Sequence, residues 1–252
     1  MHCKTQGIVL RETNYKEADK LLTVLTRDMG KRTVKARGCR RKGSGLSASA
    51  QLLVYSEMTL FEYRDYYTVN EAESLEQFWG VRSDIELLAL CSYFAEVTEA
   101  VAEEGRAQPE LLSLLLNSIY ALDQLKKPQG LVKTAFELRL TCLAGYEPLV
   151  DACAVCGEEE PKDPRLSLAD GVLHCARCRE DPGQGRSLPV PPAALAALRH
   201  LARCPPKRLT SFELDPVSLG ALGEATEAFL LTQLERPFRT LGFYTDLHRN
   251  IP

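Results

Sequence analysis

The sequence lacks any apolar run near the roughly 20 residues of a membrane-spanning helix, and residues 1–7 contain no signal-peptide core. These absences predict a soluble, cytoplasmic protein without a membrane partner. The chain also lacks a glycine-rich Walker loop, a His-Glu-x-x-His motif and a nucleophile elbow. A zinc deaminase would need a His-x-Glu segment before a Pro-Cys-x-x-Cys motif, and neither is present. We therefore predict that the protein is not an enzyme.

What is present is a globular composition of 252 residues, 45% hydrophobic and 26% charged, enough for one large or two small domains. Nine cysteines, an odd number in a chain without a secretion signal, argue against a disulfide framework. Four of them form two Cys-x-x-Cys pairs. We interpret the other five as small buried hydrophobes or inert thiols: Cys3, Cys39, Cys91, Cys142 and Cys204.

The charge is divided unevenly along the chain. Residues 1–46 hold 12 Lys and Arg against 4 Asp and Glu, a net charge of +8, whereas the rest of the chain has a net charge of −11. Such a division indicates that one end binds a polyanion, although an uneven solvated surface would also produce it.

The first 75 residues predict five short antiparallel strands, because β-branched and aromatic residues alternate between turn signals. Gly30 lies in one of these turns, where a positive φ suits glycine. Five such strands fit a barrel of the OB type, and the pattern alone also allows an SH3-like barrel. The predicted strands are residues 7–11, 21–26, 32–37, 52–61 and 67–71.

From about residue 76 the apolar period becomes helical. Ser83 and Glu86 are spaced as a capping box, Pro109 suits the first turn of a second helix, and Asp215 precedes a longer helix that Pro237 should end. The predicted fold class is therefore α+β: an OB-type barrel over 1–75, then a helical domain over 76–252 with an insertion at about 147–186.

That insertion carries the cysteine pairs, Cys153 with Cys156 and Cys175 with Cys178, separated by 18 residues. The spacing is typical of four-thiolate zinc sites, because two residues between thiols let a tight turn present both sulfurs to one ion. Four protein ligands leave no position for water, so the predicted zinc is structural. Redox pairs are the alternative, and His174 is interpreted as a bystander. Residues 147–191 are poor in large apolar side chains, which predicts that metal rather than a hydrophobic core holds them together.

Residues 27–42 contain eight basic residues and one acid, Asp28. Strand alternation places Lys31, Thr33, Lys35 and Arg37 on one face, and Val34 and Ala36 on the other. This cationic face leads into a glycine-flanked basic loop, a pattern that favours nucleic-acid phosphates. A membrane surface or an acidic protein is the alternative partner. The candidate phosphate-binding residues are Lys31, Lys35, Arg37, Arg40, Arg41 and Lys42.

Tyr55, Phe61 and Tyr63 share one face of the fourth predicted strand. They could stack on bases or pack in the core, and the sequence leaves both alternatives open.

A set of short segments spread over the chain forms a recognisable pattern: Gly7-Ile-Val-Leu10, Tyr15-Lys-Glu-Ala-Asp19, Leu25-Thr26, Gly30-Lys31, Ala36-Arg-Gly38, Ser47-Ala48, Gln51 and Gly145-Tyr-Glu-Pro148. These segments resemble the RecO family of bacterial recombination mediators, and the resemblance extends over nearly the whole sequence. One departure is Leu52-Leu53, where the family often has Pro-Phe.

The resemblance implies a non-enzymatic role in recombinational DNA repair. RecO-like proteins bind single- and double-stranded DNA and anneal complementary strands. They act with RecR to load RecA onto DNA coated by single-stranded DNA-binding protein. The resemblance also implies that the basic barrel residues contact DNA and that the protein is bacterial, cytoplasmic and associated with the nucleoid. An RNA-binding or ribosome-associated zinc module and a plain single-strand-coating protein are the alternatives.

Overall fold

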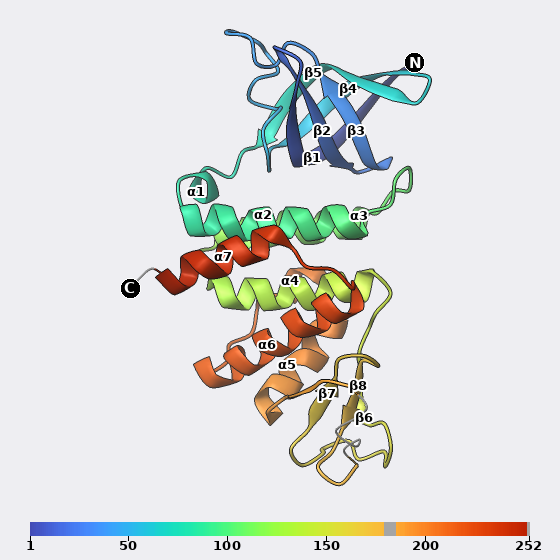
Figure 1. Ribbon diagram of the computed structural model, residues 1–252, viewed down its shortest axis with the longest axis vertical. Coiled ribbons are helices and arrows are strands. Elements are labelled where there is room, and N and C mark those ends of the chain that lie inside the picture. Colours follow the sequence, from blue (N-terminus) through green and yellow to red (C-terminus); the bar gives the residue numbers. More distant parts are fainter. Residues whose placement is uncertain (179–184, 251–252) are drawn as a thin grey trace. The chain divides into compact units, whose positions relative to one another are not determined.

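The structure is a computed structural model that describes residues 1–178 and 185–250 (Figure 1). The part of the predicted insertion at 179–184 lies outside the described residues. Contacts group the chain into two compact units, residues 1–124 with 238–252, and residues 125–237. Each unit is described by itself below.

The first unit opens with a closed five-stranded barrel, as the sequence predicts. The strands follow the order β1-β2-β3-β5-β4, and β4 pairs with β1 to close the ring. Every pairing is antiparallel except β3 with β5. This is an OB-like barrel, and it settles the choice against the SH3-like alternative. The strands are β1 His2–Tyr15, β2 Asp19–Thr26, β3 Gly30–Ala36, β4 Tyr55–Tyr63 and β5 Tyr66–Glu76.

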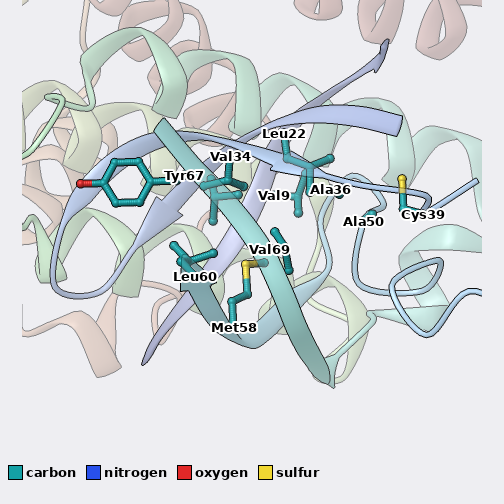
Figure 2. Packing of buried hydrophobic residues seen from close by; sticks show 11 residues of the cluster. Val9, Leu22, Val34, Ala36, Cys39, Ala50, Met58, Leu60, Tyr67 and Val69 are labelled. Atoms are coloured by element: carbon teal, nitrogen blue, oxygen red, sulfur yellow. The ribbon is translucent and has the colours of Figure 1, made fainter. Parts of the chain in front are cut away.

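The barrel core forms because apolar residues recur at every second position and therefore point to the same side of each strand. Figure 2 shows these side chains converging from all five strands and from the loop after β3. Val34 and Ala36 belong to this core, as their alternation with basic residues predicts. The core cluster comprises Val9, Leu22, Val24, Val34, Ala36, Cys39, Ala50, Met58, Leu60, Tyr67 and Val69.

Two turns of the barrel bear on the sequence predictions. Gly30 has φ +64, as expected, and a side chain there would collide with the backbone of Arg106. The sequence pattern predicts that the fourth strand begins at residue 52, whereas β4 begins at Tyr55. Leu53 is buried with φ 62 and donates its N–H to Val9 O, so the chain turns before the strand starts.

The helices of the first unit are α1 Trp79–Arg82, α2 Ile85–Val101, α3 Pro109–Asp123 and α7 Arg239–Asn250. The predicted capping box is wrong in one detail: Asp84, not Ser83, is the N-cap of α2, and its carboxylate accepts from the N–H groups of Glu86 and Leu87. The charged carboxylate also interacts favourably with the positive end of the helix dipole. Pro109 begins α3 as predicted, whereas α7 was not predicted.

The second unit contains α4 Gln129–Leu143, α5 Pro192–Arg203 and α6 Pro216–Gln233, with a short 3₁₀ turn at Pro206–Arg208. Asp215 caps α6 as predicted, since its side chain accepts from Val217 N and Ser218 N. Between α4 and α6, the buried Lys133 ammonium lies 2.6 Å from a Glu137 carboxylate oxygen and 2.6 Å from one of Glu227.

The insertion has more internal structure than the sequence suggests. A four-stranded sheet in the order β6-β8-β7-β9 runs through it, and leucines from three of its strands are buried beneath it. The prediction that no hydrophobic core holds this segment is therefore wrong, because even three-residue strands bury one leucine each. The strands are β6 Leu149–Cys153, β7 Arg165–Ser167, β8 Val172–His174 and β9 Ser187–Pro189.

Candidate nucleic-acid interface and metal centre

The six predicted phosphate-binding residues fall into two groups in the structure. Lys31 and Lys35 are half-buried on the outer face of β3, and the other four side chains are exposed in and beside the following loop. Lys31 is held by α2: its ammonium donates to Glu99 O at 2.8 Å. This contact leaves Lys31 less suited to a ligand than the sequence implies.

Lys35 is half-buried and contacts two residues of other elements. Its Nζ lies 2.8 Å from Asp19 Oδ2 and 4.9 Å from the centre of the Tyr15 ring. Hydrogen bonds from Lys35 and from Gly38 N hold the pKa of Asp19 below its usual value, so this carboxylate stays ionised. The ion pair orients Lys35 beside Tyr15.

The basic loop after β3 is anchored through its backbone, which leaves its cationic side chains free. Gly38 N donates to Asp19 Oδ1 at 2.8 Å, and Arg40 N donates to Ala18 O at 3.0 Å. Cys39, between these anchors, is buried in the barrel core. Four exposed cationic side chains of this loop make no ion pair with any described residue: Arg37, Arg40, Arg41 and Lys42.

These anchors bring the β1–β2 turn against the basic loop. The turn contributes Tyr15 and Lys16, whose ammonium lies 5.5 Å from the Tyr15 ring centre. Sequence reasoning missed both residues, although an aromatic followed by a lysine in a barrel turn was a usable signal. We call Tyr15, Lys16, Lys35, Arg37, Arg40, Arg41 and Lys42 the basic surface.

The three aromatic residues predicted to share a face of β4 differ in their burial. The half-buried Tyr55 donates its hydroxyl to Gln6 Oε1 at 2.9 Å. Phe61 and Tyr63 are exposed, so neither belongs to the barrel core.

The four predicted metal ligands come together in the second unit. The Sγ atoms of Cys153, Cys156, Cys175 and Cys178 all lie within 4.8 Å of one another, and those of Cys156 and Cys175 are 3.8 Å apart. Thiolates about 2.3 Å from a tetrahedral ion are separated by roughly 3.8 Å, so the group has the size that such an ion requires. His174 is buried nearby on β8 and is not one of the four.

The thiol pKa values reflect this crowding. Burial acts to raise the pKa of Cys153, but hydrogen bonds from the backbone N–H groups of Cys156, Val155 and Cys175 lower it to about 6. The sulfurs of Cys175 and Cys156 raise the pKa of Cys178 to about 12. Four thiolates repel one another unless a cation lies between them, so the group can bind a metal ion.

The scaffold around the cysteines fixes both pairs. Cys153 ends β6, and Cys175 follows β8, the strand that pairs with β6. Arg199 of α5 donates to the backbone oxygens of Val150 and Asp151 at 2.8 Å each. The sheet and α5 therefore position the ligands without depending on the ion alone.

Across the described ranges, 1–178 and 185–250, we find no helix that is both long enough and apolar enough to cross a bilayer.

The chain combines an OB-like barrel that carries a basic surface with helices and a four-cysteine group. These features define a class of proteins in which a barrel is followed by a helical region. Comparisons with known proteins make the assignment specific. The family description "Recombination protein O N terminal" matches residues 1–78, and "Recombination protein O C terminal" matches residues 82–242. The chain belongs to the RecO family, and its role lies in DNA repair and recombination.

Individual relatives support the same assignment. The chain is 33% identical to a protein named "DNA repair protein RecO" from Acetivibrio thermocellus over 98% of both chains. It is 35% identical to a protein of the same name from Desulforudis audaxviator over 95% of both chains. A third, from Moorella thermoacetica, is 32% identical over 97% of this chain and 91% of its own.

Proposed function

We propose that the protein binds single- and double-stranded DNA through its basic surface and anneals complementary strands. The observation that carries this proposal is the backbone-anchored loop after β3, which presents Arg37, Arg40, Arg41 and Lys42 to solvent. Lys35 would contribute beside them, and Lys31 would mainly join the barrel to α2. Cations on a fixed loop suit a phosphate backbone, and they carry no sequence information.

Annealing by this route needs no catalytic residue and no nucleotide, which agrees with a non-enzymatic role. Base pairing itself supplies about 1.4 kcal/mol per step. The protein's contribution is to neutralise phosphates on one strand and thereby reduce the repulsion between two polyanions. From its family, we further propose that it acts with RecR to load RecA onto DNA coated by single-stranded DNA-binding protein. It would do so in the bacterial cytoplasm, at the nucleoid.

We propose that the metal is zinc in a structural role. The donor set of four thiolates is the one that structural zinc sites use, and it leaves no open position for substrate. The 3.8 Å separation between Cys156 Sγ and Cys175 Sγ supports this. The zinc would fix the turns that carry the two cysteine pairs, and the sheet already orders the segment between them.

The domain boundary near residue 75 also remains a proposal. Residue 75 is the second-last residue of the strand β5, and the two family descriptions meet between residues 78 and 82. Contacts nevertheless group α1, α2, α3 and α7 with the barrel. We propose that residues 1–75 bind DNA and that 76–252 support the barrel and receive partners.

The experiment that tests the function is annealing of complementary fluorescent oligonucleotides without ATP, on bare DNA and on DNA coated with single-stranded DNA-binding protein. A mediator accelerates pairing at sub-saturating protein. If pairing only slows at every protein concentration, the protein is a coating protein instead. Preference for RNA in a parallel titration would favour an RNA-binding module.

A further inference from the structure

The hairpin between β4 and β5 ends in a group of exposed aromatic side chains. Arg64 and Asp65 both have positive φ, 48° and 63°, as in a two-residue type I′ turn. Tyr63 and Tyr66 pair directly across this turn, so their side chains leave the same face of the hairpin. The turn therefore fixes two tyrosines side by side at the end of the barrel.

Two more rings continue this face. Phe61 lies two residues before Tyr63 on β4 and pairs with His2 of β1, and the two rings are 5.2 Å apart between centres. Tyr66 is 78% exposed, Tyr63 58% and Phe61 38%. We call His2, Phe61, Tyr63 and Tyr66 the aromatic tip.

The spacing of the tip suits nucleobases. Residues two positions apart on a strand are about 6.7 Å apart, which is about twice the 3.4 Å rise per base of a single strand. One base can therefore lie between the Phe61 ring and the Tyr63 ring and contact both. Aromatic rings held at this spacing on a rigid strand form a platform for stacking.

The charge at the tip favours bases over phosphates. The Arg64 guanidinium lies 5.2 Å from the Tyr63 ring centre, and the chain's terminal ammonium donates to Glu62 O at 2.8 Å. The Glu62 and Asp65 carboxylates offset these two positive charges. Because the tip is close to neutral, its attraction for DNA would come from its rings.

The tip is continuous with the basic surface. Lys35 of β3 is level with Thr68 of β5, so Tyr66 is level with Thr33, which is exposed on the same outer face. Arg37 directly follows β3 and lies four residues beyond Thr33, about 13 Å away. At the other end of β3, Glu104 bridges to Lys31, and its carboxylate would repel phosphates.

We propose that the aromatic tip stacks on the bases of single-stranded DNA whose phosphates lie on the basic surface. The strand runs along the outer face of β3, from Tyr63 and Tyr66 toward Arg37 and the loop after it. This inference rests on the proposed DNA binding and adds a second, uncharged set of contacts. Duplex DNA, whose bases are stacked and paired, makes no use of the tip.

The test compares Tyr63→Ala/Tyr66→Ala with the wild type in anisotropy titrations of a thymidine oligonucleotide of about 20 nucleotides, over several salt concentrations. Affinity should fall about tenfold or more, because the bases lose their stacking contacts with two rings. The salt slope should not change, since no phosphate contact is lost. Affinity for duplex DNA and for an abasic oligonucleotide should equal that of the wild type.

Two controls keep the outcomes separate. Tyr63→Phe/Tyr66→Phe retains the rings and should bind like the wild type, and Tyr120→Ala removes an exposed tyrosine from α3 and should have no effect. If the alanine variant binds the thymidine oligonucleotide as tightly as the wild type, the inference is wrong while DNA binding stands. Equal losses on abasic and normal DNA would also overturn it. If the wild type binds no DNA, the proposed function itself fails.

Discussion

The basic loop gives a prediction whose size can be worked out from its contacts. Arg37, Arg40 and Lys42 are exposed and make no ion pair within the described residues, so replacing all three with alanine removes three of the proposed phosphate contacts without opening the barrel core. On single-stranded DNA each contact contributes about 0.7 to the salt slope. The slope should therefore fall by about 2.1.

That change in slope corresponds to a large shift in relative affinity. Between about 50 mM and 200 mM salt, the ratio of wild-type to variant affinity should fall about 18-fold. The assay is an anisotropy titration of a labelled single strand at four or more salt concentrations. Oligonucleotides of unrelated sequence should give the same result, because phosphate contacts do not distinguish bases.

A matched control separates this local effect from net charge. Lys126, Lys207 and Arg208 are exposed in the second unit, and replacing them with alanine lowers the net charge by the same three units. That variant should keep the wild-type slope. An unchanged slope in the Arg37, Arg40 and Lys42 variant, or an equal fall in the control, would refute the assignment of the basic loop to DNA.

Three further predictions concern the metal, the helix packing and a helix cap. Cys153→Ser or Cys178→Ser should lose bound metal by elemental analysis and increase amide exchange around the cysteine turns, while the barrel keeps its thermal transition; metal-free protein purified under reducing conditions would contradict this. Lys133→Met should lower the free energy of unfolding by about 3–5 kcal/mol, because buried Glu137 loses its cation. Burial lowers the pKa of Lys133, but Glu137 and Glu227 outweigh it and raise the pKa. The contribution of Lys133 to stability is therefore fully present below about pH 10.4, the unfolded pKa of lysine, and is lost as the pH rises through the higher folded pKa. If denaturant titrations show that the wild type already loses this stability near neutral pH, the ion-pair explanation is wrong. Asp215→Ala should cost about 1 kcal/mol by removing the α6 cap, and Asp215→Asn should retain most of it.

The barrel could be predicted from the sequence because its strands alternate between core and solvent. Val34 and Ala36 face the core and alternate with the polar residues Thr33, Lys35 and Arg37, and that period fixes the face of β3 before any tertiary contact is known. The pairing of β3 with β5 could not be predicted in the same way. It is parallel and brings together residues more than 30 positions apart, and alternation carries no information about partners.

The parts that escaped prediction are short or polar. The strands β7, β8 and β9 have three residues each, too few to show a period. Helix α7 is mostly polar, and its position depends on tertiary contacts: Glu96 of α2 accepts from Thr240 N at 3.0 Å, and Tyr93 makes an edge contact with Phe238. A cap supplied by another helix leaves no signal in the local sequence.

The two candidate sites also differ in how much the local sequence predicts. The cysteine group could be predicted because spacing alone determines which sulfurs can reach one ion. For the basic residues, the sequence gives a candidate group but not the contacts that each member makes. Lys31 and Lys35 share a strand face by alternation, yet Lys31 donates to α2 and Lys35 pairs with Asp19. Partners supplied by other elements decide which charges stay available to a ligand.

Closure of the barrel explains why the proposed DNA contacts lie where they do. Four of the five strand pairings in the ring run along most of the strands, so most backbone N–H and C=O groups are satisfied within the sheet. Binding therefore relies mainly on outward side chains and the connecting loops. The loop after β3 meets this condition because Cys39 and the bonds to Ala18 and Asp19 fix its backbone. Its cations can therefore be exchanged without disturbing the core, which makes affinity and fold stability separately adjustable in this barrel.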